Sequence, residues 1–474
     1  MNNKFKQLLS NTFAFAIGNI LTKLILFFLM PLYTSAMTTQ QFGIAELLNN
    51  SVEFALPIAS LCIYDAVFRY AIDKDADHKK LLTNGLNILF KSFIIAGVLI
   101  FALNWFIKYE YAWHFGLMLF TAALRQLFAQ FARGVGHVKR FAVSGILNAL
   151  FLGIFNVIFL VGFNLDIDGY LISIILSNFI STVFIMFASK IYRYISFDSI
   201  DKELLKSMLI FSLPQIPNML SWWITNLSSR YVIAGFCGAG LAGLFTAASK
   251  LPSMVNLLTS IFQKAWQFSS SRELGEKDSN EFFSDVFKAF SAFILISCSG
   301  LILLVPLISK FILKGDFYQA WIYVPLLMVS AALNSYSVYF GTFYTAAKKN
   351  KMIMVSTMIG AAVSLFICFI TIPFIGIYGA LIASVISYLV IVMIRIFDTQ
   401  KYVTIDLNWK INITTFALLL LQAILMTLDL QFSQILSCAC FIAILGGNIA
   451  NYYKDIFTIA KKVINTHNET HLLK

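Results

Sequence analysis

Charged residues are scarce in this sequence, which limits the class of protein it can form. Only 12% of the 474 residues are Asp, Glu, Lys or Arg, whereas 59% are hydrophobic. A soluble domain of this size needs far more polar surface. Length alone would suggest about three soluble domains. No stretch between the apolar runs is long enough to form one, so a soluble multidomain protein is excluded.

The sequence also lacks the motifs of several chemical functions. It has no GxxxxGK[ST] phosphate-binding loop, so we expect no ATP hydrolysis. No loop is long enough to hold the DxD site of a glycosyltransferase or a polymerase site, which argues against an enzyme of polysaccharide assembly. No metal-site spacing occurs among the six cysteines, which are Cys62, Cys237, Cys298, Cys368, Cys438 and Cys440. We therefore expect no catalytic residues, no cofactor and no metal site.

Apolar runs of about 20 residues recur along the whole chain, which predicts an all-α, polytopic membrane protein. The first run is too long for the apolar part of a signal peptide, so we expect it to be retained as a helix. The 14 candidate spans are residues 11–33, 42–66, 84–106, 112–132, 141–163, 169–189, 208–233, 240–263, 286–309, 319–345, 352–373, 376–397, 409–428 and 433–453.

The basic residues lie in short loops on one side of these spans. With both termini in the cytoplasm, 26 of the 35 Lys and Arg residues fall in cytoplasmic segments, and Arg395 is counted among them. Only Lys108, Lys310 and Lys314 fall on the opposite side. This bias predicts a bacterial inner-membrane protein with cytoplasmic termini. The net charge of +12 therefore does not indicate a nucleic-acid partner.

The first six spans resemble the next six. Phe42-Gly43-Ile44-Ala45 corresponds to Ala242-Gly243-Leu244-Phe245, and Gly169-Tyr170-Leu171-Ile172 to Gly379-Ala380-Leu381-Ile382. This repeat predicts a six-helix half over 1–206, a second over 207–400, and two additional helices with a tail over 401–474. Transporters built from such repeats place the substrate between the halves.

Polar residues form stripes on several spans, and polar groups within a bilayer commonly face a cavity. Span 2 carries Glu46, Asn49, Asn50 and Glu53 at helical spacing. Its repeat mate, span 8, carries a similar stripe with Lys250 and Ser253. Such groups can also hold helices together. Pro57 and Pro252 interrupt these two spans and are expected to bend them, either as gating bends or as static kinks.

The charged members of these stripes are the strongest candidates for a site. Lys23 and Lys250 lie about halfway along their spans, whereas Arg125 and Arg230 could instead reach an interface. The predicted substrate-binding residues are Lys23, Lys250, Arg230, Arg125, Asn50, Ser253, Asn19 and Thr225. Glu46 and Glu53 could neutralise the cations or act as ion-coupling residues.

The sequence resembles the Wzx-type polysaccharide flippases of the multidrug/oligosaccharidyl-lipid/polysaccharide (MOP) superfamily. The likeness rests on the segment from Asn11 to Asn19, on Phe42-Gly43, on the segment from Gly243 to Lys250, and on the span plan. It implies translocation of an undecaprenyl-pyrophosphate-linked oligosaccharide, an O-antigen or capsule repeat unit. Alternating access, coupling to an ion gradient and partnership with membrane lipid and a polysaccharide polymerase complex are also implied.

Other functions stay open from the sequence. A lipid II flippase of the same superfamily fits the span count, whereas the two extra spans argue against a plain 12-span multidrug exporter. A membrane-integral enzyme of polysaccharide assembly would need an acid or base in a large loop, and none is present. A scaffold without transport activity is the remaining alternative.

Overall fold

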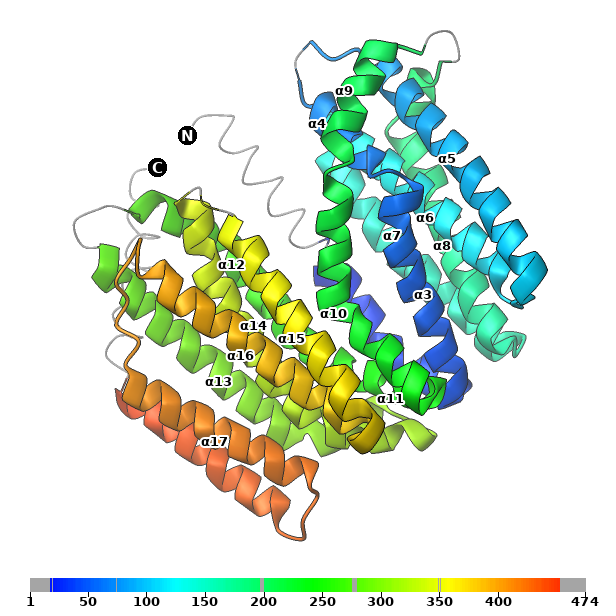
Figure 1. The fold of residues 1–474 in the computed structure, drawn as a ribbon. Coiled ribbons are helices and arrows are strands. Elements are labelled where there is room, and N and C mark those ends of the chain that lie inside the picture. The colour runs from blue at the N-terminus through cyan, green and yellow to red at the C-terminus, as the bar shows by residue number, and fades with distance from the viewer. Residues whose placement is uncertain are drawn as a thin grey trace, which may run out of the picture. The chain divides into compact units, whose positions relative to one another are not determined.

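The computed structural model describes residues 18, 20–73, 75–196, 200–274, 279–347, 349 and 351–451. Within these ranges every regular element is a helix, and no strand occurs (Figure 1). Ten helices are long and apolar enough to cross a membrane. Two bent pairs of helices and the shorter apolar helix Ile20–Ala36 account for three further predicted spans. The predicted all-α polytopic fold is confirmed.

Contacts divide the chain into two compact units. Unit 1 consists of Met1–Tyr231 and Gly238–Gly243, and unit 2 of Val232–Cys237 and Leu244–Lys474. The division into 1–206, 207–400 and 401–474 that the repeat predicts stays a prediction.

Unit 1 contains the first eleven described elements, with α10 passing out of it near its end. They are α2 (Met30–Ala36), α3 (Thr39–Ala59), α4 (Ile63–Ala71), α5 (His78–Ile107), α6 (Ala112–Gly134), α7 (Val138–Asn156), η1 (Val157–Gly162), α8 (Asp166–Ala188), η2 (Ile191–Tyr194), α9 (Lys202–Ser212) and α10 (Gln215–Cys237). Its hydrophobic core joins α4, α5, α6 and α9 through Val67, Leu82, Leu127 and Met208.

Unit 2 contains the remaining elements. They are α11 (Ala239–Lys250), whose first turn belongs to unit 1, α12 (Pro252–Glu273), α13 (Ser279–Ile312), η3 (Gly315–Tyr323), α14 (Val324–Ala346), α15 (Lys351–Ile375), α16 (Ile377–Thr399), α17 (Trp409–Thr427) and a last helix, Ser433–Asn451. Aromatic rings fill the space between α12, α13 and α14, where Trp266 stacks on Tyr339 with ring centroids 5.0 Å apart.

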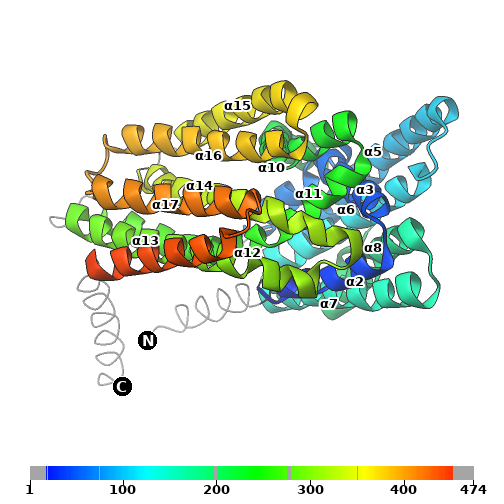
Figure 2. The same ribbon diagram turned by 90° about the horizontal axis from the view of Figure 1, so that it is seen from below.

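The two helices that the repeat does not explain, α17 and Ser433–Asn451, lie beside α13 (Figure 2). Buried Gln422 of α17 fastens them there. Its Nε2 donates to the carbonyl oxygens of Ser299 and Ser437, at 3.1 and 3.2 Å. One amide therefore links three helices across otherwise apolar surfaces.

The second predicted span is broken. The prediction gave one helix over 42–66, but α3 ends at Ala59 and α4 begins at Ile63, with a bend of 62°. Pro57 lies near the end of α3, and Cys62 has a left-handed φ of 49°. The repeat mate bends by 43° between α11 and α12, where Pro252 begins the second helix. The expected bends at both prolines are present.

Two further sequence predictions are wrong in detail. Span 7 was expected over 208–233, but α9 ends at Ser212 and α10 begins at Gln215, because Pro214 cannot continue the hydrogen-bonded helix. Arg395 was expected in a loop segment, but it lies in α16 with only 6% of its surface exposed. Hydrogen bonds to neighbouring helices, described below, keep it buried.

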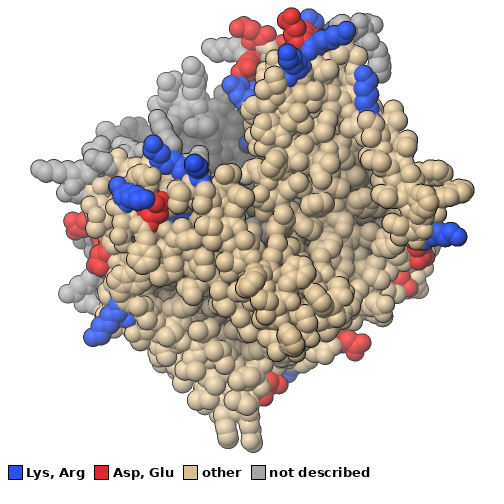
Figure 3. All heavy atoms as spheres, viewed as in Figure 1, with Lys and Arg blue, Asp and Glu red and all other residues tan. Residues whose placement is uncertain are grey.

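Charged side chains gather at one end of unit 1, near α4, α9 and the start of α5 (Figure 3). Two ion pairs lie there, Arg69–Asp73 at 2.8 Å and Lys80–Asp201 at 3.5 Å. The length of α5 instead exposes apolar side chains such as Ile94 and Phe106. This separation is the pattern of helices that contact lipid along their sides and water at their ends.

Candidate functional site

A polar cluster lies between α3 and α10 within unit 1. We define the α3–α10 cluster as Glu46, Asn50, Ser51, Glu53, Trp223, Arg230 and Tyr231. Glu46, Asn50 and Glu53 recur at spacings of four and three residues and therefore share one side of α3, and Ser51 follows Asn50. An N-terminal capping box between Thr38 and Gln41 fixes the start of α3.

Hydrogen bonds and ring contacts hold α10 against α3. The Tyr231 hydroxyl donates to the carbonyl oxygen of Leu47 at 2.9 Å and lies 2.8 Å from Ser51 Oγ. The Trp223 indole Nε1 donates to the carbonyl oxygen of Asn50 at 2.8 Å. The Trp223 ring also packs on Phe54, with centroids 4.7 Å apart. These contacts fix the two helices near the charged residues.

The charges of this cluster belong to Arg230 and two glutamates. Arg230 interacts electrostatically with Glu46 and with Glu53. Its Nε and the Asn50 Nδ2 are buried donors that have no hydrogen-bond partner among the described residues. A buried donor without a partner is costly unless a bound molecule satisfies it. The cluster therefore offers a cation and two donor groups to an anionic, oxygen-rich ligand.

Glu46 also joins a second set of buried polar groups. It is 5% exposed, and its Oε1 accepts a hydrogen bond of 3.2 Å from the Tyr170 hydroxyl of α8. The Tyr170 ring meets that of Tyr33 edge-on at 5.2 Å, and Asn156 Nδ2 donates to the Tyr33 hydroxyl at 3.2 Å. The carboxylate therefore accepts a hydrogen bond from tyrosine and interacts electrostatically with arginine.

Sequence reasoning missed Tyr33, Tyr170 and Asn156. Each lies within an apolar run, and the two tyrosines read as aromatic packing residues. The available signal was the hydroxyl group, since buried tyrosine hydroxyls usually find a partner. Nothing in the sequence identified Glu46 as that partner, because Tyr170 lies 124 positions along the chain from it.

Arg125 takes part in a different set of contacts. Its Nε donates to Asn178 Oδ1 of α8 at 2.9 Å, and Asn148 Nδ2 of α7 donates to the same oxygen at 3.1 Å. The guanidinium is half-buried. These bonds join α6, α7 and α8, so the structure gives Arg125 a helix-bridging contact.

The remaining predicted residues are dispersed. Lys23 is exposed on the helix Ile20–Ala36 of unit 1, while half-buried Lys250 ends α11 in unit 2, beside the 43° bend. Ser253 is exposed in the first turn of α12. Asn19 lies outside the described residues, as does the side chain of Thr225. In the described ranges no three His, Cys, Asp or Glu side chains could hold a metal ion.

Unit 2 contains a buried cation that the sequence did not single out. Arg395 donates through Nε to Ser356 Oγ at 3.0 Å and through Nη1 to the carbonyl oxygen of Ser337 at 2.7 Å. Its Nη2 donates to Thr357 Oγ1 at 3.0 Å. The guanidinium thus ties α14, α15 and α16 together, and its nitrogens are occupied within the fold.

Comparisons with known proteins agree with one another. A family profile described as "Polysaccharide biosynthesis protein" matches residues 8–268, more than half of the chain. No curated protein matches the sequence of this chain significantly. A solved structure titled as the lipid II flippase MurJ, inward closed, is 15% identical with a TM-score of 0.66, covering 94% of this chain and 99% of that one.

Two solved multidrug resistance MATE transporters of the MOP superfamily have a similar fold. The inward-facing one is 13% identical with a TM-score of 0.64, covering 80% of this chain and 95% of its own. The outward-facing one is 16% identical with a TM-score of 0.57, covering 84% and 95%. At these identities the likeness shows the fold alone, which is similar to the folds of MurJ and of these two MATE transporters.

Proposed function

We propose a function from the premise that this chain belongs to the polysaccharide biosynthesis protein family. The protein is a flippase that moves a polyprenyl-pyrophosphate-linked oligosaccharide, such as an O-antigen or capsule repeat unit. It works in the bacterial inner membrane, with both termini in the cytoplasm, and transfers its substrate to the periplasmic leaflet by alternating access. Its charged α3–α10 cluster receives the anionic headgroup.

The observation that carries this proposal is Arg230 beside Glu46 and Glu53, with a buried Nε donor left without a partner. A guanidinium group that is taken out of water carries a desolvation cost of several kcal/mol. Helix packing does not require that cost, since Asn or Ser supplies hydrogen bonds without a charge. A pyrophosphate entering a low-dielectric site does require a cation, and arginine's fork of donors suits phosphate oxygens.

The two glutamates provide a route to ion coupling. In the empty protein both interact with Arg230, and the three groups carry a formal net charge of −1 when both carboxyls are ionised. When pyrophosphate oxygens bind the guanidinium, a carboxylate loses its counter-charge. Binding of a proton or a metal cation to that carboxylate then becomes more favourable. Substrate binding and ion binding are thereby linked at Glu46 and Glu53, as an ion-gradient-driven transporter requires.

Other residues contribute further polar and cationic groups to the transport path. The donor Asn50 belongs to the cluster itself. The remaining proposed contributors are Lys23, Lys250, Arg125, Ser253, Asn19 and Thr225. A polysaccharide polymerase complex is the proposed recipient of the translocated unit.

A second candidate substrate is the lipid II named for the flippase of similar fold. That structure covers nearly the full length of both chains, although 15% identity supports the fold alone. The two substrates are separated by asking which lipid the purified protein moves.

The proposal is tested by replacing Arg230 in a strain whose chromosomal copy has been deleted. We expect Arg230→Gln to abolish surface glycan while the protein still reaches the membrane, because the amide retains hydrogen bonding but not charge. Arg230→Lys should keep part of the activity. The matched control is Arg69→Gln, since Arg69 is an exposed arginine at a helix end. Normal surface glycan with Arg230→Gln would refute the role of the cluster.

A further inference from the structure

Two neighbouring hollows in unit 1 lead from the side of α5 and α6 to the α3–α10 cluster. The first lies between α5 and α6 and has a volume of about 310 Å³. The second has a volume of about 460 Å³ and includes Ser51 and Tyr231 in its lining. Ile100 lines both. An apolar hollow thus adjoins one that reaches the polar cluster.

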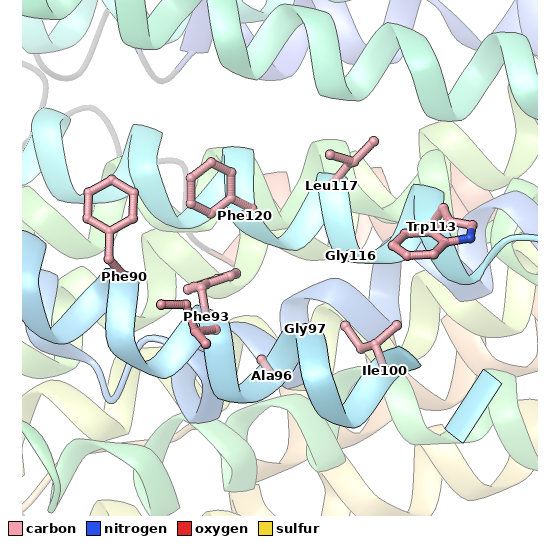
Figure 4. A pocket seen from close by; sticks show the side chains of 10 residues that line it. Phe90, Phe93, Ala96, Gly97, Ile100, Trp113, Gly116, Leu117 and Phe120 are labelled. Carbon is pink, nitrogen blue, oxygen red and sulfur yellow. The ribbon is translucent and has the colours of Figure 1, made fainter. Parts of the chain in front are cut away.

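Two glycines, Gly97 of α5 and Gly116 of α6, line the first hollow. Figure 4 shows side chains of α5 and α6 along its walls, with Gly97 and Gly116 between larger residues. Phe93 and Phe120 meet on one side of the glycines, with ring centroids 5.4 Å apart. A Cβ on Gly97 would meet nothing within 4 Å, so the space above it is open.

This hollow opens sideways, where lipid would lie. The apolar stretch of α5 is only 17% buried within the protein, and Leu117 and Trp113 at the rim are 52% and 64% exposed. The second hollow leads inward to Tyr231 and Ser51, whose oxygens lie 2.8 Å apart. Arg230 is the next residue to Tyr231 along α10. The lining therefore changes from apolar between α5 and α6 to one that includes the hydroxyl groups of Ser51 and Tyr231, two members of the α3–α10 cluster.

We propose that the α5–α6 hollow binds the polyprenyl chain of the substrate while the α3–α10 cluster holds its pyrophosphate. This inference rests on the proposed function. Within a bilayer no hydrophobic force favours protein over lipid for a free chain. A chain tethered to a headgroup that is bound at the cluster is held at a high effective concentration in the hollow. The tethered chain therefore occupies it in preference to bulk phospholipid.

The test is photo-cross-linking in phospholipid vesicles containing undecaprenyl phosphate. A photoreactive amino acid replaces Leu117 at the rim or, as the matched control, Ile442, which is 62% exposed on the last helix. We expect undecaprenyl phosphate to be captured at position 117 about tenfold more than at position 442. The double variant Gly97→Leu, Gly116→Leu should remove most of that excess by filling the hollow.

Two results would overturn the inference. One is equal capture at both positions. The other is capture of phospholipid at position 117 that added undecaprenyl phosphate does not displace. This second measurement keeps both glycines, so it does not depend on whether the double glycine variant folds. Failure of the proposed function is distinguishable: if Arg230→Gln abolishes export but the probe is not captured, the chain site alone is wrong. If the probe is captured while Arg230→Gln exports normally, the headgroup site is wrong.

Discussion

A close helix crossing in unit 1 joins the start of α3 to the start of α11 and depends on Gly43. A Cβ placed on Gly43 would lie 1.9 Å from the carbonyl oxygen of Ala239, and one on Gly243 would lie 2.2 Å from that of Thr39. Real Cβ atoms do not approach closer than 3.0 Å, so Gly43→Ala must separate the helices by about 1 Å. The obstacle is backbone, which cannot rotate away as a side chain can.

The expected cost follows from this geometry. Overpacking usually destabilises by about 1–3 kcal/mol, and the rigid partner places Gly43→Ala at the upper end. The change to alanine restores only about 0.5–1 kcal/mol of folding free energy, because alanine has less conformational freedom than glycine in the unfolded chain. We therefore expect a lower Tm for the purified variant in detergent. Gly235→Ala is the control, because nothing lies within 4 Å of its added Cβ, and it should leave Tm unchanged or raised. An unchanged Tm for Gly43→Ala would refute the close crossing.

Three further predictions concern other contacts. Arg395→Lys should lower Tm nearly as much as Arg395→Ala, because lysine cannot reproduce the fork, and each buried partner left unsatisfied costs about 1–3 kcal/mol; a fully stable lysine variant would contradict this. Gln422→Leu should weaken the attachment of the last two helices, seen as faster proteolysis after α16, whereas exposed Lys410→Leu should not. At the start of α9, backbone hydrogen bonds from Leu204 hold the pKa of Asp201 below its ordinary value of 3.8. The ionised Asp201 cap should therefore stabilise α9 above pH 3.8, and this stabilisation should be lost as the pH falls. Hydrogen-exchange protection of the α9 amides, corrected for the intrinsic exchange rate, should drop on acidification of the native protein. In Asp201→Asn it should stay level.

Long apolar runs made most helices predictable, since length and hydropathy alone define a span. The breaks were harder. Cys62 adopts a left-handed conformation although it is not glycine, so no residue type marked the end of α3. Pro57 indicated that the span would bend but not where the helix would end. The polarity of α10 was visible in the sequence as a stripe. Pro214 marked the break between α9 and α10, but the prediction of one span over 208–233 did not use it.

The candidate site was predictable only in part. Helical spacing put Glu46, Asn50 and Glu53 on one side of α3, and the charge in the next half drew attention to Arg230. Spacing carries no information about which helices pack together, so the pairing of Arg125 with Asn178 was out of reach. The same limit hid the burial of Arg395, whose partners come from two other helices.

Translocation by the purified protein tests the central claim most directly. The protein is reconstituted into vesicles with a fluorescent polyprenyl-pyrophosphate-linked oligosaccharide, and the fraction reaching the opposite leaflet is measured with a membrane-impermeant quencher under an imposed ion gradient. We predict gradient-dependent movement of this lipid by the native protein and its loss in Arg230→Gln. Movement of lipid II but not of the oligosaccharide lipid, or equal movement by Arg230→Gln, would contradict the account.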